Sequence, residues 1–224
     1  KSTAHSILET LSHYGLLERD AATKTYRLGY GLFELGNLVA DRMEVRQVAQ
    51  PFLRDLAQAV EETVFLGVFR DDHVIIVDKE ESPHDVKITS PLGRRIPHCA
   101  GAFGKVFHAA MPESDLDRLI KRKGLRAFTV FSLTDADAYR TELEQVRSLG
   151  YALDREEYLA EVRAGGAPVV NAHNQVVAAL CVVGFSSRLP DTRLEQVAQQ
   201  VRQAAEEVSR RLGARGYPAW DGIG

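Results

Sequence analysis

Four side chains of the 224-residue chain have the chemistry to bind a metal or to act as a nucleophile: His98, Cys99, Asp154 and Cys181. Imidazole, thiolate and carboxylate groups are the ligands that zinc accepts in tetrahedral protein sites. Neighbouring residues on a strand point to opposite faces, so His98 and Cys99 are not expected to bind one ion together. We therefore expect no metal, and keep a zinc ion near His98, Asp154 and Cys181 as an alternative.

A cysteine nucleophile is the competing chemistry, because a thiol beside a base can form covalent intermediates. Cys181 lies in a run of valine, leucine and alanine residues. Burial in such surroundings raises the pKa of a thiol and suppresses its reactivity. The sequence also lacks a Gly-x-Ser-x-Gly motif, a phosphate-binding loop and a dinucleotide fingerprint. We therefore expect that the protein is not an enzyme.

The stretch Leu92–Lys105 combines turn residues with the start of a helix. Pro97 cannot continue a central strand ladder, and Gly101 and Gly104 allow another part of the backbone or a ligand to come close. A helical run follows, so free backbone N–H groups at its start would face whatever lies beside the glycines. The pattern alone leaves open whether a ligand, a metal ion or merely another strand lies beside the glycines.

The elements around this loop are strands joined by short turns, with helices between them. That arrangement is typical of an α+β domain with a mainly antiparallel sheet. Apolar periodicity predicts helices at Val45–Ala59, Phe103–Ala110, Glu113–Arg122, Ala138–Leu149 and Leu194–Leu212, and strands at Thr63–Arg70, His73–Lys79, Val86–Thr89, Tyr151–Asp154, Ala164–Val170 and Val176–Phe185.

The first part of the chain has the order of the back half of a winged helix. An amphipathic helix over Ser2–Tyr14 is followed by a polar hairpin, and a second amphipathic helix is predicted at Tyr30–Met43. The alternative is a small cap whose polar residues are simply solvated. In the winged-helix interpretation, the major groove would be met by Lys1, Ser2, Thr3, His5 and Ser6, and phosphates by Lys24 and Arg27.

Composition limits the class of protein. A hydrophobic content of 45% with 26% charged residues is ordinary for a globular protein. The formal net charge of −3 argues against a protein that coats nucleic acid, but not against a small DNA-reading module. No apolar run approaches the length of a membrane span, and two cysteines without CxxC spacing suit a reducing cytosol. We expect a cytoplasmic protein.

Six segments of the chain, in this order, match the pattern of a known family: Lys1–Leu17, Thr25–Gly29, Pro97–Lys105, Gly150–Tyr158, Ala167–Asn171 and Gly184–Leu189. They closely resemble IclR-family transcriptional regulators. The resemblance implies an α+β chain in which a partial winged helix-turn-helix precedes a GAF-like antiparallel-sheet effector domain with flanking helices. Two further helices precede this point in the family, so we expect an N-terminally truncated chain. The implied divisions are 1–29 for the recognition helix and wing, 30–43 for a linker helix, 44–215 for the effector domain and 216–224 for a tail.

The resemblance also implies an effector site between the glycine loop and the strands that follow Gly150. Phe103, Cys181 and Val183 are bulkier or less polar than the residues of family members that bind small carboxylates. This difference favours a more apolar carboxylic acid, such as an aromatic or acyl acid, over one like glyoxylate or pyruvate. Asp154 would accept a proton from the effector or cap a turn. The implied lining is Ile88, Ile96, Ala102, Phe103, Asp154, Ala164, Cys181 and Val183.

The function implied by the resemblance is that of a ligand-responsive transcriptional regulator, with repression of catabolic genes as the commoner case. Its partners would be double-stranded operator DNA, a small organic acid and further copies of itself in a homodimer or tetramer. The alternative is a small-molecule or zinc sensor domain that binds no DNA in its truncated form.

Overall fold

The computed structural model describes residues 2–41, 44–217 and 220, and the chain divides into two compact units, Lys1–Gln47 and Val48–Gly224. The division falls inside helix α3 (Glu44–Val60). Each unit is described by itself. No helix within the described ranges is long and apolar enough to cross a membrane.

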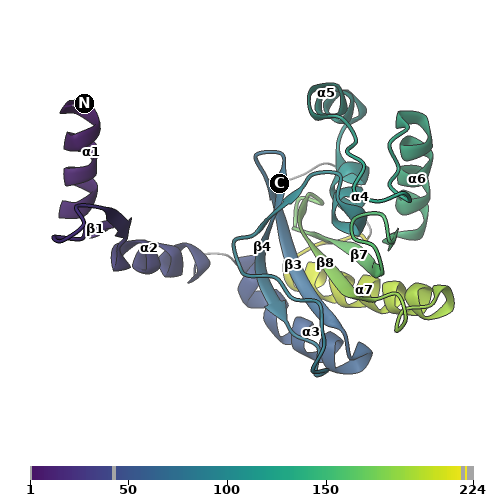
Figure 1. Cartoon of the computed structure of the whole chain (residues 1–224). Helices are drawn as coiled ribbons and strands as arrows, with labels where there is room; N and C mark the ends of the chain where they lie inside the picture. The colour runs from purple at the N-terminus through teal and green to yellow at the C-terminus, as the bar shows by residue number, and fades with distance from the viewer. Residues whose placement is uncertain (1, 42–43, 218–219, 221–224) are drawn as a thin grey trace. The chain divides into compact units, whose positions relative to one another are not determined.

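The first unit is a helix, a two-stranded antiparallel hairpin and a second helix (Figure 1). Gly15 has a left-handed backbone (φ 68°), which ends the first helix and turns the chain into the hairpin. Both helices leave apolar side chains exposed: Ile7 is 55% exposed and Phe33 68%. The elements are α1 (Ser2–His13), β1 (Leu17–Arg19), β2 (Tyr26–Leu28) and α2 (Tyr30–Asp41).

The second unit is built on a six-stranded antiparallel sheet with the strand order β5-β4-β3-β8-β7-β6. Strands β3 and β4 form a hairpin whose two-residue turn, Asp71–Asp72, has positive φ at both positions, as a type I′ turn requires. The strands are β3 (Thr63–Arg70), β4 (His73–Glu80), β5 (Arg95–Pro97), β6 (Ala152–Arg155), β7 (Val162–Val170) and β8 (Val176–Phe185).

Helices cover both faces of the sheet, and two neighbouring glycines of β7 mark the closest approaches. A Cβ on Gly165 would lie 3.0 Å from Cβ of Ala198 in α7, and one on Gly166 would lie 3.3 Å from Cβ of Ala102 in α4. Adjacent strand residues point to opposite faces, so α4 and α7 lie on opposite sides of β7. The helices are α4 (Gly101–Ala110), α5 (Glu113–Lys123), α6 (Ala136–Leu149) and α7 (Asp191–Arg211).

Two contacts connect α3 to α7. Near the start of α7, Nη2 of Arg193 donates to the carbonyl oxygen of Val60 at the end of α3, at 3.0 Å. At the other end of α7, the guanidinium of Arg211 lies 5.9 Å from the ring centroid of Phe52. The strand β8 between the helical layers is apolar along its length and almost entirely buried, as its sequence predicts.

The α+β prediction is confirmed, but one predicted strand is wrong. Val86–Thr89 is irregular, and the outer partner of β4 is the short strand β5. The polar side chains of this segment bond locally instead: Lys87 Nζ donates to the carbonyl oxygen of Ser82, and Thr89 Oγ1 donates to Glu81.

The segment expected to be a tail carries two residues that pack on the domain. The hydroxyl of Tyr217 donates to the carbonyl oxygen of Pro168 at 2.8 Å, and Nε1 of Trp220 donates to that of Arg147 at 3.2 Å. Both rings adjoin the hydrophobic core around α4 and α6.

Candidate functional site

A cavity of about 210 Å³ lies where the start of α4 meets the sheet. Three of its lining residues are direct cross-strand neighbours: Asp154 is paired with Ala164, and Ala164 with Val183. Phe65 and Cys181 are likewise paired in register. Paired residues share one face of a sheet, so this row of side chains points toward α4 together.

All eight residues that the family resemblance implies for the effector line this one cavity. They come from the segment before β5, from β5 itself, from α4 and from three strands. These residues are Ile88, Ile96, Ala102, Phe103, Asp154, Ala164, Cys181 and Val183.

Most of the remaining lining is apolar as well. The volume of the cavity is below the roughly 300–1,000 Å³ of pockets that hold drug-sized ligands. A ligand of the size of a small metabolite would therefore fit. Sequence reasoning did not find the other lining residues, which are Phe65, Ile76, Thr89, Ser90, Arg94, Ala100, Tyr158, Leu159 and Val162.

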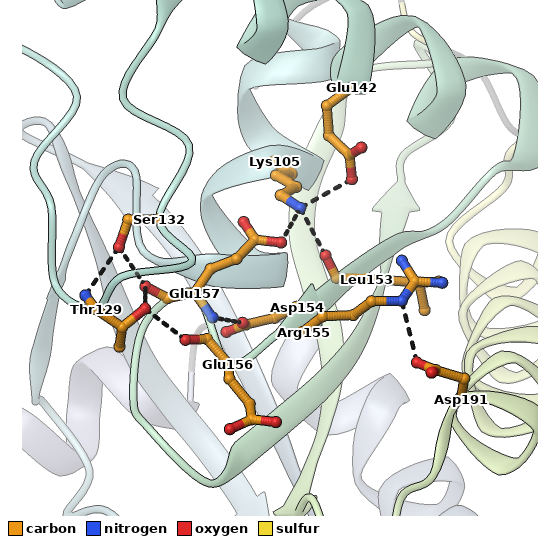
Figure 2. A network of polar contacts seen from close by, with 10 residues as sticks. All are labelled: Lys105, Thr129, Ser132, Glu142, Leu153, Asp154, Arg155, Glu156, Glu157 and Asp191. Atoms are coloured by element: carbon orange, nitrogen blue, oxygen red, sulfur yellow. Dashed lines mark hydrogen bonds and ion pairs between the residues drawn. The ribbon is translucent and has the colours of Figure 1, made fainter.

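Asp154 is the one buried carboxyl group of the lining, at 5% exposure. Its Oδ1 accepts a hydrogen bond from the backbone N–H of Glu157 at 2.7 Å (Figure 2). Burial raises the pKa of Asp154 to about 7, and the negative charge of Glu157 adds to this effect. The carboxyl group is therefore close to half-protonated near neutral pH.

Gly101, the first residue of α4, lies directly against this carboxyl group. Its backbone is left-handed (φ 49°), and a Cβ at this position would collide with Oδ2 of Asp154. The residue before the helix, Ala100, provides no side-chain cap. The carboxyl group of Asp154 therefore lies against the start of α4, where a helix favours negative charge.

Lys105, one turn into α4, is a buried cation that the sequence analysis did not single out. Its Nζ donates to Oε1 of Glu157 at 2.6 Å, to Oε1 of Glu142 at 2.8 Å and to the carbonyl oxygen of Leu153 at 2.7 Å (Figure 2). A buried ammonium requires such partners. A lysine inside an otherwise apolar helix is the sequence feature that hints at this role.

The same three bonds join α4 to α6 and β6. The turn after β6 is held from its other side by the loop before α6. Thr129 Oγ1 donates to the carbonyl oxygen of Glu156, and Ser132 Oγ to that of Glu157, both at 2.7 Å. Tyr158, which lines the cavity, packs edge-to-face on Phe128.

A second polar group lines the cavity next to β5. Oγ of Ser90 is buried and, among the described residues, has no hydrogen-bond partner. Leaving a buried hydroxyl unpaired costs about 1–3 kcal/mol, so this oxygen marks a place where a ligand atom would be stabilising. Arg94 lines the cavity in the same region and is exposed.

The alternative zinc site near His98, Asp154 and Cys181 is not formed. Nδ1 of His98 lies 3.3 Å from Nε2 of His108, whose Nδ1 lies 2.8 Å from the hydroxyl of Tyr139. His98 is absent from the cavity lining. Throughout the described part of the chain, no three histidine, cysteine or acidic side chains are arranged to hold a metal ion.

The two cysteines remain thiols. Burial raises the pKa of Cys99 and, more strongly, that of Cys181, which is 1% exposed. A neutral thiol is a weak nucleophile, and Cys181 contributes an apolar surface to the cavity.

The residues predicted to contact DNA are spread over α1 and the hairpin. Thr3, His5 and Ser6 are exposed on α1, and Lys24 lies at the hairpin tip. Arg27 is paired with Glu18 on the neighbouring strand, with Nη2 2.6 Å from Oε2. Ser2 is the first residue of α1, and Lys1 lies outside the described residues.

Comparison with known proteins shows to which family this chain belongs. Residues 37–210 match the family described as bacterial transcriptional regulator IclR C-terminal. The HTH-type transcriptional regulator XynR of Escherichia coli K12 is 36% identical over 219 residues, which cover 98% of this chain and 86% of XynR. The HTH-type transcriptional repressor AllR of the same strain is 30% identical, over 97% of this chain and 80% of AllR.

A solved structure has the same fold. The IclR transcriptional regulator from Alicyclobacillus acidocaldarius matches with a TM-score of 0.82 and 31% identity, over 99% of this chain and 85% of that one. Proteins of this kind regulate transcription and are not enzymes. The chain belongs to the IclR family of ligand-responsive transcriptional regulators.

Proposed function

We propose that this protein is a cytoplasmic repressor of catabolic genes whose affinity for operator DNA changes when a small organic acid binds in the cavity. The observation that carries the proposal is the convergence of eight implied effector residues, from α4, three strands and the segment around β5, on one cavity. The apolar lining favours an acid with an apolar body. The name of AllR, a transcriptional repressor, supports the repressor part.

The proposal assigns a task to each part of the chain. Residues 1–29 bind DNA, 30–43 form a linker helix, 44–215 bind the effector and 216–224 form the C-terminal segment. Exposed residues of α1 and the hairpin are available for DNA: Thr3, His5, Ser6, Lys24 and Arg27. Arg27 would exchange its partner Glu18 for a phosphate.

A homodimer or tetramer would present two such modules, so the operator would have approximate two-fold symmetry. The effector can alter operator affinity only by its difference in affinity for two arrangements of the protein. Within the effector domain, Lys105 joins α4 at the cavity to α6 and β6.

The test combines DNA selection with a variant that fills the cavity. The full gene product is used to select sequences from a random duplex library, and small carboxylic acids are screened by thermal shift. We expect a symmetric sequence whose binding weakens with salt, and a rise in Tm with an acid. Ala164→Phe should abolish that rise and leave DNA affinity unchanged, because Ala164 is remote in sequence from the DNA-binding residues and faces the cavity. Ala164→Leu is the milder second variant.

If the gene product selects no DNA sequence, the regulator proposal is wrong, and the alternative of a sensor domain without DNA binding takes its place. If an acid still raises the Tm of both Ala164 variants by the wild-type amount, the acid does not bind in this cavity.

A further inference from the structure

The cavity has two polar ends, and they belong to opposite edges of the sheet. Arg94 directly precedes β5 at one edge, and Asp154 lies on β6 at the other. Apolar residues of the strands between them, such as Phe65 and Val183, line the middle. A ligand that spans the cavity therefore meets a cation at one end and a carboxyl group at the other.

At the end of the cavity near α4, the protein itself provides a carboxyl group. The carboxyl group of Asp154 lies against Gly101 at the start of the helix and accepts the backbone N–H of Glu157. The incoming carboxylate of a ligand would have to share this position with Asp154. Two carboxyl groups in contact repel unless they hold a proton between them.

Near β5, none of the described residues that line the cavity is acidic. Three nearby basic side chains have carboxylate partners, since Lys79 and Lys87 pair with Glu81 and Arg95 lies 3.8 Å from Asp71.

Arg94 differs from these three. Within the described residues its guanidinium has no partner, although its backbone is fixed to β4. The carbonyl oxygen of Arg94 accepts from the N–H of Ile76 at 3.1 Å, and the N–H of Gly93 donates to the carbonyl oxygen of Ile76 at 2.7 Å. The main chain of Arg94 is thus fixed beside the cavity that this residue lines.

Ser90 provides the second, independent observation at this end. Its buried Oγ lines the cavity without a hydrogen-bond partner among the described residues. Ser90 and Arg94 line the same cavity, and a hydroxyl and a guanidinium are donors suited to the two oxygens of one carboxylate.

We propose that Arg94 and Ser90 are the specificity-determining residues of the cavity and bind the carboxylate of a monocarboxylic acid whose apolar body extends toward Asp154. This inference rests on the proposed function, because it concerns the effector of that same cavity. A dicarboxylate of the same length is rejected, since its second charge meets the carboxyl group of Asp154 at the far end.

The probes are hexanoate and phenylacetate, their neutral amides, and the dicarboxylate adipate. Their affinities for the full chain are measured by calorimetry at pH 7.5. At least one monocarboxylate binds, and its amide and adipate bind at least about tenfold more weakly. Arg94→Met lowers the affinity for the acid by about ten- to a hundredfold, as expected for the loss of a charge-assisted contact. Ser90→Ala lowers this affinity by a smaller factor.

Arg95→Met is the matched control. Arg95 is the next residue along the chain, is also exposed, and pairs with Asp71 instead of lining the cavity. Its substitution leaves acid binding unchanged. Asp154→Asn raises the affinity for adipate relative to hexanoate, because the repelling carboxyl group is gone.

Three results overturn the inference: neither acid binds, an amide binds as well as its acid, or Arg94→Met binds the acid like the wild type. Ala164→Phe separates this failure from that of the proposed function. If the acid binds Arg94→Met but not Ala164→Phe, the cavity is the site and only the assignment to Arg94 is wrong. If the acid binds both variants, the cavity is not the effector site.

Discussion

Asp154 shows how the surroundings of one residue set its chemistry. It is buried on β6, close to the charge of Glu157 and against the first residue of α4. Burial and the like charge raise its pKa, while the backbone N–H of Glu157 and the charge of Lys105 act in the opposite direction. These opposing effects together give Asp154 a pKa of about 7.

The first prediction concerns the pH dependence of stability. The folded-state pKa of Asp154, about 7, is above the ordinary value of 3.8 for an aspartate side chain, so the folded protein binds this proton more tightly than the unfolded chain. Stability contributed by this group is therefore lost as pH rises from about 4 to about 7. In Asp154→Asn this decrease in the free energy of unfolding, on the order of 4 kcal/mol at most, should be absent. The measurement is urea unfolding of both proteins at pH 5 and pH 8.

Asparagine keeps the oxygen that accepts the N–H of Glu157, so the variant tests charge with little change of shape. Other groups titrate in both proteins; burial lowers the pKa of His108 to about 3, for example. The difference between variant and wild type isolates Asp154. The same difference at pH 5 and pH 8 would contradict a titration in this range.

At the residue scale, the family resemblance pointed to eight residues that line one cavity, whereas contacts with partners distant in the sequence were missed. Apart from Ile88, the eight implied residues lie within or a few positions from the segments that resemble the family. Lys105 was not assigned because its partners Glu142 and Glu157 are far away in the sequence. Ser90 and Arg94 were missed because they lie in an irregular segment, where alternation says nothing about direction.

At the scale of elements, the pair Gly165–Gly166 determines how closely two helices approach the sheet. Each glycine removes a Cβ from one face of β7, and the helices α7 and α4 fill the two spaces. The sequence predicted most helices and strands with small boundary differences, because their apolar periodicity is strong. It could not predict which strands pair at a distance, such as β3 with β8.

The second prediction tests the approach of α7. In Gly165→Ala the new Cβ would lie 3.0 Å from Cβ of Ala198 and 3.1 Å from its Cα. Such overpacking costs about 1–3 kcal/mol, measured as a decrease in the free energy of unfolding. Ala198→Gly in the same protein should restore part of the loss, because the colliding methyl group is removed.

A matched control is Gly216→Ala. Nothing lies within 4 Å of the position that its Cβ would take, so the unfolding free energy should hardly change. If Gly165→Ala is as stable as Gly216→Ala, the packing of α7 against β7 is looser than the structure indicates.

At the scale of the whole molecule, the two units differ in how they bury apolar side chains. The second unit encloses a core that extends to its last described residue, Trp220. The first unit leaves apolar side chains of α1 and α2 exposed, Tyr30 at 80% and Val39 at 63% among them. Exposed apolar faces of this kind mark surfaces that bind another partner or another part of a protein.

The third prediction concerns the C-terminal segment. Trp220→Ala should destabilise the second unit by about 1–3 kcal/mol, less than the roughly 3–5 kcal/mol for a fully buried aromatic side chain, because the ring is only partly buried. The loss includes the bond from its Nε1 to the carbonyl oxygen of Arg147. Urea unfolding, followed by far-ultraviolet circular dichroism, measures it.

Tyr217→Phe serves as a milder comparison, because it removes only the hydroxyl that donates to Pro168 and keeps the ring. We expect a smaller loss, near the about 1 kcal/mol of one hydrogen bond. Wild-type stability in both variants would show that the segment is a dispensable tail.

The pairing of β3 with β8 has a consequence for how the protein is made. Thr63 pairs with Val183, so the centre of the sheet is a seam between an early half, β3 to β5, and a late half, β6 to β8. While the ribosome is still translating, the early half presents an unpaired apolar strand edge, which favours aggregation. The cavity has walls in both halves. An effector that binds this cavity, as we propose, would therefore have nothing to bind until synthesis is nearly over, and it would stabilise a finished domain without guiding its assembly.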